Sequence, residues 1–228
     1  MSFPRVHAEE AMDDPALDPA VYAAVLRDLA RVNTVTMAAR PTLGFLDSLA
    51  GRGDRLKLLD VGFGDGDMLR RIARWAAARG VAAELVGIDL NPHSADVARA
   101  DTPVDLPITY RTGDYADLAG AGFDVIVSSL VAHHMTRDQL IAFLRFMEAE
   151  AARGWLVNDL HRHRFAHAGY PLLARILRWH PIVRADGTLS IARSYRPEEW
   201  PPLLDAAGVQ GARVVRRFPF RLCVERRR

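Results

Sequence analysis

Short apolar segments alternate with amphipathic ones from about residue 56 to residue 160, and this alternation constrains the fold more than any other feature of the chain. The apolar segments have the length and composition of buried strands, and the segments between them have helical spacing. Successive strand–helix–strand units connect parallel strands through right-handed crossovers, so that helices cover both faces of the sheet. We therefore expect an α/β protein with a doubly wound, mostly parallel sheet.

The expected element positions follow from these runs and their spacing. The strands are Leu56 to Val61, Glu84 to Leu90, Ile108 to Arg111, Phe123 to Ser128 and Trp155 to Leu160. The helices between them are Met68 to Arg79, Ser94 to Ala100 and Asp138 to Ala152. Residues 213–224 are expected to form two strands that meet at Phe218-Pro219. This hairpin would complete a seven-stranded sheet with one antiparallel strand.

Helical segments outside the sheet are expected at both ends of the chain. Residues 18–49 have the spacing of two helices, which we place in an N-terminal helical cap over residues 13–50. Another helix is expected over Pro197 to Ala207. Because no linker or repeat separates these parts, we expect residues 1–228 to form a single domain.

A lid insertion is expected after the fifth strand, over residues 161–195. It contains a predicted helix from Phe165 to Trp179, and Asp186-Gly187 reads as a turn. An apolar helical stripe most often faces a protein core. This helix has no place in the sheet, however, so part of the stripe is expected to cover an aromatic, polyketide-like or lipid-like ligand. Arg193 is interpreted as either an anchor of the lid or a ligand contact.

A glycine-rich turn, Asp60-Val61-Gly62-Phe63-Gly64-Asp65-Gly66, follows the first expected strand. Ligands of parallel sheets bind beyond the carboxyl ends of the strands, and glycine lets the backbone approach them, although a tight connection alone also uses glycine. A dinucleotide fingerprint would need glycine at position 67, which is aspartate. Three carboxylates, of Asp60, Asp65 and Asp67, would repel a diphosphate. They favour a positively charged ligand such as S-adenosylmethionine (SAM), which carries a sulfonium and an ammonium.

Two later strands end in polar residues suited to an adenosine group. Asp89 ends the second strand and can accept both hydroxyl groups of a ribose, a role shared by nucleotide-binding and SAM-binding folds. After the third strand, Asp114 could accept from an adenine amino group and Tyr115 could pack on the ring. The alternative for Asp114 is a helix N-cap.

These motifs resemble a known family. The segment from Leu59 to Gly66, Asp89 and the Gly113-Asp114 step are similar to the successive motifs of class I SAM-dependent methyltransferases, and the similarity runs from Lys57 to Leu160. Ser129-Leu130-Val131-Ala132-His133-His134-Met135 is similar to a segment of the small-molecule branch, which includes ubiquinone/menaquinone-type and natural-product O-methyltransferases. The resemblance implies a Rossmann-like fold and a SAM pocket. Its expected lining is Asp60, Gly62, Phe63, Gly64, Gly66, Asp89, Leu90, Asp114, Tyr115, Ser129 and His134.

His133 and Asp159 are the candidate catalytic residues. They follow the fourth and end the fifth strand, so the sheet would bring both to the edge where an acceptor must lie. Histidine suits the removal of a hydroxyl proton near neutral pH, and a carboxylate on its other nitrogen fixes the tautomer. The alternative is that His133 only begins the next helix while His134 packs against the cofactor. Which of His133, His134 and His161 is the base stays open.

The resulting functional hypothesis is methyl transfer from SAM to a small aromatic or polyketide/lipid-like acceptor, at a hydroxyl oxygen, in natural product biosynthesis. Methylation of carbon or nitrogen is an alternative. A nicotinamide-dependent oxidoreductase would share Asp89 but not the acidic turn. A non-catalytic SAM-binding subunit would keep the turn and lack the histidines.

Several classes of partner are not expected. The segment Ser128-Ser129-Leu130 replaces the Pro-Pro motif of nucleic-acid amino-methyltransferases, and the arginines are scattered, so we expect no nucleic acid partner. Serine also replaces the aspartate that would hold magnesium. The His161 and His163 pair lacks a third ligand, and Cys223 is the single cysteine, so we expect no metal. The chain has no apolar stretch of membrane-spanning length, and we expect a cytoplasmic protein, with a homodimer left open.

Overall fold

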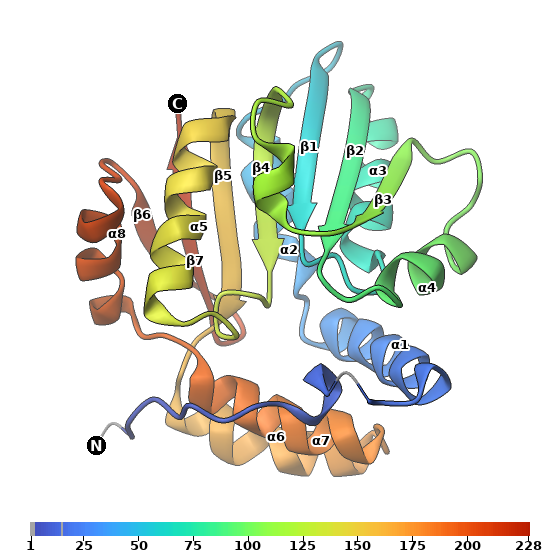
Figure 1. The fold of residues 1–228 in the computed structure, drawn as a ribbon, viewed down its shortest axis with the longest axis vertical. Helices are drawn as coiled ribbons and strands as arrows, with labels where there is room; N and C mark the ends of the chain where they lie inside the picture. Colours follow the sequence, from blue (N-terminus) through green and yellow to red (C-terminus); the bar gives the residue numbers. More distant parts are fainter. Residues whose placement is uncertain (1–2, 15) are drawn as a thin grey trace.

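The centre of the computed structural model, which describes residues 3–14 and 16–228, is one twisted seven-stranded sheet (Figure 1). Its strands are β1(Arg55–Val61), β2(Ala82–Asp89), β3(Ile108–Thr112), β4(Phe123–Ser129), β5(Ala151–Leu160), β6(Arg213–Arg217) and β7(Arg221–Arg227). Their order is β3-β2-β1-β4-β5-β7-β6. Strands β1 to β5 are parallel, and β7 runs antiparallel to both neighbours. The doubly wound sheet with one antiparallel strand is therefore confirmed.

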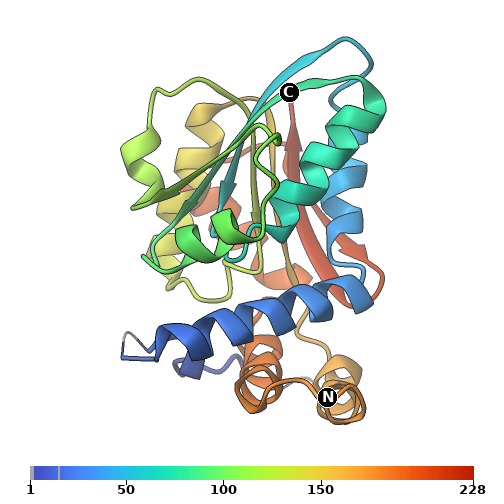
Figure 2. The same cartoon turned by 90° about the vertical axis from the view of Figure 1, so that its right-hand side faces the viewer.

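Two hydrophobic cores cover the two faces of the sheet. Successive residues of a strand point to opposite faces, so that Leu58 packs on one side of β1 and Leu59 on the other, both fully buried. The Leu58 face is covered by α2(Ala39–Asp47), α3(Asp67–Arg79) and α4(Ser94–Ala100). The opposite face is covered by α5(Arg137–Glu150), α8(Pro201–Ala207) and the short η2(Tyr115–Leu118). Figure 2 shows helices on both sides of the sheet. Burial on both faces explains why the strands read as continuous apolar runs.

A third layer lies below the carboxyl ends of the parallel strands (Figure 1). It consists of α1(Pro19–Val35), α6(Arg164–Ile176) and α7(Pro181–Arg193), which pack around a small core of their own containing Val25, Trp179 and Val183. The segment before α1, with η1(Ala11–Asp13), runs along α7. This layer places apolar side chains opposite the strand ends, where a ligand of the sheet must bind.

The insertion after β5 differs from its prediction in one respect. It contains two helices, and Asp186 and Gly187 lie inside α7 rather than in a turn. The carboxylate of Asp186 accepts hydrogen bonds from the backbone N–H groups of Ala11 and Met12 (3.0 and 2.9 Å), and Gly187 leaves room for the Tyr170 ring. These tertiary contacts explain why Asp186 and Gly187 lie in a helix, although local sequence rules assign the pair to a turn. The predicted helix at 197–207 also divides, into η3(Pro197–Glu199) and α8.

Among the described residues, no helix combines the length and the apolar character that crossing a bilayer requires.

Candidate active site

A cavity of about 870 Å³ lies between the carboxyl ends of the strands and the layer of α1, α6 and α7. Ten of the thirteen residues named from the sequence line it, namely Asp60, Gly62, Phe63, Gly64, Asp89, Leu90, Tyr115, Ser129, His133 and His134. Gly66, Asp114 and Asp159 are not part of the lining. The strand ends and the two helical segments thus enclose a single space large enough for two small molecules.

The turn after β1 must be glycine where it approaches the cavity. Gly62 has a φ of +76°, and a Cβ atom there would lie 2.3 Å from the Val131 side chain. Gly66, which precedes α3, has a φ of +78°, and its Cβ would lie 2.4 Å from the Tyr110 hydroxyl. Both positions exclude a side chain, Gly62 beside the cavity and Gly66 in the packing beneath it. A contact of Gly66 with the cofactor stays a prediction.

Asp114 caps η2 by accepting from the backbone N–H of Ala116 at 2.9 Å, which is the alternative that the sequence left open. Tyr115 lines the cavity while its ring packs on Phe143 and Phe146, with ring centroids 4.9 Å apart in each case. Contacts of either residue with adenine remain predictions.

Two of the three carboxylates around the turn form ion pairs with arginines, so the turn carries less negative charge than the sequence alone predicts. Asp65 pairs with Arg70 (2.9 Å), and Asp67 pairs with Arg71 (2.8 Å), because helix α3 places each arginine four or five residues after its carboxylate. Asp60 is buried, and neither of its carboxylate oxygens has a hydrogen-bond partner among residues 3–14 and 16–228. Of the acidic residues at the ends of β1 and β2 that the structure describes, Asp60 and Asp89 therefore line the cavity without an ion-pair partner.

Burial, and secondarily the charge of Asp89, raises the pKa of Asp60 to about 8. Burial likewise raises the pKa of Asp89, although the backbone N–H groups of Asn91 and Gly64, each 2.9 Å away, oppose this shift. Two carboxyl groups that gain no compensating cation from residues 3–14 and 16–228 form a site suited to a positively charged ligand.

His133 and Asp159 form a buried pair, of which His133 lines the cavity and Asp159 lies behind it. The Nδ1 atom of His133 lies 2.7 Å from Asp159 Oδ1, and the backbone N–H of His133 donates to Oδ2 at 2.9 Å. Burial opposes ionisation of Asp159, but the His133 ring and backbone N–H donors outweigh it and hold the pKa of Asp159 below its usual value. The carboxylate therefore fixes the ring through Nδ1 and leaves Nε2 directed toward the cavity.

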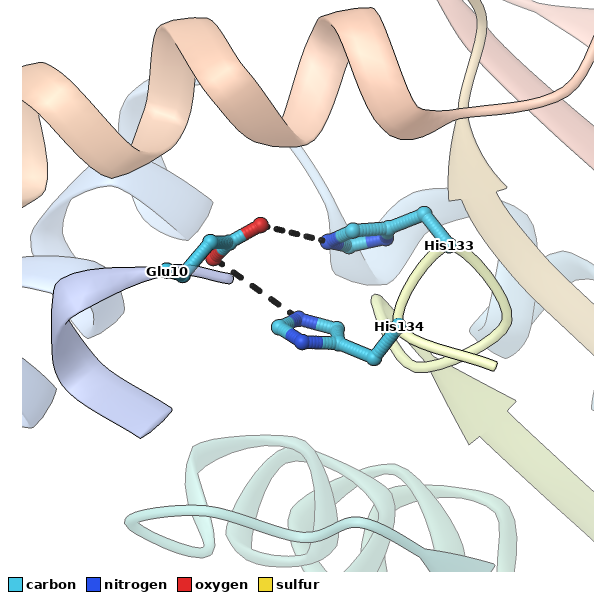
Figure 3. Close-up of side chains that lie close together, drawn as sticks. All are labelled: Glu10, His133 and His134. Atoms are coloured by element: carbon cyan, nitrogen blue, oxygen red, sulfur yellow. Dashed lines mark ion pairs between the residues drawn. The ribbon is translucent and has the colours of Figure 1, made fainter. Parts of the chain in front are cut away.

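His134 and two acidic residues complete this part of the site. Glu10 and His134 lie close to His133 (Figure 3). Asp13 joins them through His134, whose Nδ1 is 2.9 Å from Asp13 Oδ2. Burial would lower the pKa of His134, but Asp13 and Glu10 outweigh it and raise the pKa. Glu10 and Asp13 were missed by the sequence analysis because they precede the first helix and match no motif. Ligand atoms of Glu10, His133 and His134 lie within 4.8 Å of one another, a set that could hold a metal ion.

His161 lies apart from this group. It is buried outside the cavity lining, where its backbone N–H donates to the Phe220 carbonyl at 2.9 Å. Burial and the neighbouring Arg216 lower the pKa of its ring. Of the three histidines considered from the sequence, only His133 and His134 line the cavity.

The buried Asp60 carboxyl predicts an unusual dependence of stability on pH. Its folded-state pKa exceeds the ordinary value of 3.8, so its neutral form stabilises the ligand-free fold below about pH 4, and this contribution is lost as pH rises through about 8. Asp60→Asn removes the titration. We expect the variant to be more stable than the unchanged chain by roughly 2 to 4 kcal/mol at pH 8, with a difference near zero at pH 4.

Chemical unfolding of the ligand-free protein at both pH values measures this difference. Asp105→Asn, at an exposed position, is the matched control and should be neutral at both. Equal stabilities of Asp60→Asn and the unchanged chain at pH 8 would contradict the interpretation.

Comparison with known proteins gives a consistent result. Residues 58–152 match a family model described as a methyltransferase domain. No curated protein sequence is significantly similar to the chain. Among solved structures, human N-acetylserotonin methyltransferase in complex with SAM is 15% identical with a TM-score of 0.67, over 98% of this chain and 60% of that one. This chain therefore spans less than two thirds of the human protein.

Two bacterial structures are similar over most of both chains. A SAM-dependent methyltransferase from Aquifex aeolicus is 16% identical with a TM-score of 0.64, over 92% of this chain and 97% of that one. Magnesium protoporphyrin IX methyltransferase from Synechocystis PCC 6803, with bound S-adenosylhomocysteine (SAH), is 16% identical with a TM-score of 0.55, over 94% and 89%. The chain therefore contains a methyltransferase domain at residues 58–152, in a fold that it shares with SAM-dependent methyltransferases of known structure.

Proposed function

We propose that this methyltransferase acts on the hydroxyl group of a small aromatic or polyketide/lipid-like acceptor, with His133 as the general base. The observation that carries the proposal is the buried His133–Asp159 pair at the wall of the cavity. The names of the similar structures, which include methyltransferases of N-acetylserotonin and of magnesium protoporphyrin IX, support an acceptor of small-molecule size.

The residues at the strand ends fit the proposed cofactor. Asp60 offers a buried carboxylate without a partner in the described chain, which suits the ammonium of SAM, and the bare backbone at Gly62 and Gly64 allows close approach. Asp89 retains free lone pairs for ribose hydroxyl groups beside its two backbone hydrogen bonds. SAM would supply a methyl group bonded to a positively charged sulfur, so the chain need not provide an electrophile.

The residues on the acceptor side prepare the nucleophile. His133 would accept the hydroxyl proton at Nε2 as the new bond forms, and Asp159 would stabilise the imidazolium and hold its orientation. Because Asp159 also accepts a hydrogen bond from the backbone N–H of His133, it positions the loop after β4 together with the His133 ring. Apolar side chains of the insertion, including Phe165, Leu173 and Val183, line the cavity and would exclude water from the reacting atoms. We propose that this insertion acts as the lid.

The general-base role predicts a loss of turnover in His133→Ala. The expected decrease in kcat is roughly 10²- to 10⁴-fold, with SAM affinity little changed, because a proton acceptor is lost while the cofactor contacts remain. Asp159→Asn should show a smaller loss of the same kind. Transfer of labelled methyl from SAM to a panel of phenols measures the effect, and His7→Ala, an exposed position, is the control. Full turnover in His133→Ala at pH 7 would show that His133 is not the general base.

Cofactor binding at the strand ends predicts a second result. Gly62→Val should abolish SAM binding, because the branched side chain would meet Val131 and disfavour the positive φ. Asp89→Ala should weaken binding by roughly 1.5 to 3 kcal/mol. Calorimetric titration with SAM tests both, with Gly51→Val as a control at an open, exposed glycine. Unchanged affinity in folded Gly62→Val and Asp89→Ala proteins would refute this placement.

A further inference from the structure

Three hydrogen-bond acceptors converge in the acceptor half of the cavity, on Glu10, His133 and His134 (Figure 3). His133 Nε2 lies 3.7 Å from Glu10 Oε1, and His134 Nε2 lies 3.8 Å from Glu10 Oε2. Both separations exceed the length of a hydrogen bond, so the three groups face one another without bonding directly. A water molecule or a ligand hydroxyl between them would connect them.

The partners of the two histidines determine which nitrogen faces this space. His133 Nδ1 is 2.7 Å from Asp159, and His134 Nδ1 is 2.9 Å from Asp13. A carboxylate only accepts, so the hydrogen of each neutral ring is on Nδ1. In the neutral rings both Nε2 atoms then present lone pairs toward a carboxylate that also presents lone pairs. Glu10 and Asp13 raise the pKa of His134, so its Nε2 is an acceptor above that pKa and a donor to Glu10 below it.

The carboxylate of Glu10 is held but not saturated. Its Oε1 accepts from the Ser190 hydroxyl at 2.8 Å and lies 3.5 Å from Arg193 Nη1. Its Oε2 receives no hydrogen bond from any residue that the structure describes. Glu10 is only 3% exposed and lines the cavity, so the molecule that fills the cavity decides which donor reaches this oxygen. A ligand that displaces water from the cavity must supply this donor itself.

We propose that these three acceptors form a recognition subsite for an aromatic acceptor with two hydroxyl groups, a dihydric phenol. One hydroxyl, the one to be methylated, would donate to His133, and the second would donate to Glu10 or His134. A single hydroxyl carries one hydrogen and would leave at least one of these acceptors without a donor from the ligand. The apolar lining of the insertion receives the rest of the molecule. This inference rests on the proposed methyl transfer to a hydroxyl oxygen.

A metal ion is the competing occupant of the same three ligands, and the surroundings disfavour it. The guanidinium of Arg193 lies 3.5 Å from Glu10 and 3.8 Å from Asp13, so a positive charge already neighbours the carboxylates. A divalent cation would be repelled by this group, whereas neutral hydroxyl donors would not.

Probes that differ by one hydroxyl group test the subsite. The dihydric probes are 5-pentylresorcinol and 4-pentylcatechol, and 3-pentylphenol carries one hydroxyl with the same chain. Calorimetric titration of each into the protein saturated with SAH measures binding without requiring turnover. We expect at least one dihydric phenol to bind roughly 10- to 100-fold more tightly than the monohydric one.

The variant Glu10→Gln replaces one acceptor oxygen by a donor NH₂ group, and it should reduce this preference to about threefold or less. Glu9→Gln, at the exposed neighbouring position, should retain the full preference. Unchanged SAH affinity in both variants verifies the fold. The preference should also survive treatment with EDTA.

Three results would overturn the subsite. They are equal binding of monohydric and dihydric phenols, a preference that survives in Glu10→Gln, and a preference that disappears with EDTA and returns with Zn²⁺. Failure of the proposed function is distinguishable, because tight dihydric binding without methyl transfer from SAM contradicts the reaction while supporting the subsite.

Discussion

The geometry of the site depends on how β4 and β5 lie side by side at the carboxyl edge of the sheet. Their pairing ends with Ser129 opposite Asn158, and Leu130 then donates its backbone N–H to the Asn158 carbonyl at 3.1 Å. Leu130 has a φ of +63°, a conformation that costs a bulky residue energy and turns the chain back. His133 thereby reaches Asp159 with both its backbone N–H and its ring. A single carboxylate at a strand end thus fixes the loop and the His133 side chain.

Local patterns in the sequence predict the parts of the fold that local forces determine. Parallel strands buried on both faces produce continuous apolar runs, and the strand ends of such a sheet meet at one edge, so the sequence alone groups Asp60, Asp89, His133 and Asp159 there. The same reasoning failed where tertiary contacts override local preference. Asp186-Gly187 was wrongly read as a turn because the partners of Asp186 lie at the other end of the chain.

The N-terminal segment shows why part of the site could not be predicted. Glu10 and Asp13 reach the histidines through contacts between residues more than a hundred positions apart, made by Asp186 and Arg193 of α7. No spacing rule reports contacts of this kind. A signal was present in hindsight, since Glu9, Glu10, Asp13 and Asp14 form an acidic cluster before the first helix cap. Arg193, interpreted from the sequence as an anchor or a ligand contact, anchors this segment.

The two halves of the cavity share one energetic feature. In the cofactor half, Asp60 is a buried carboxyl without a donor or cation among the described residues, and in the acceptor half three lone-pair groups face one another. Each arrangement destabilises the ligand-free fold relative to an apolar replacement. A ligand that supplies the missing charge or hydrogens relieves this cost only in the folded protein, so its binding stabilises the fold. The same groups that limit stability therefore support the ligands that we propose, a cation beside Asp60 and hydroxyl donors beside His133.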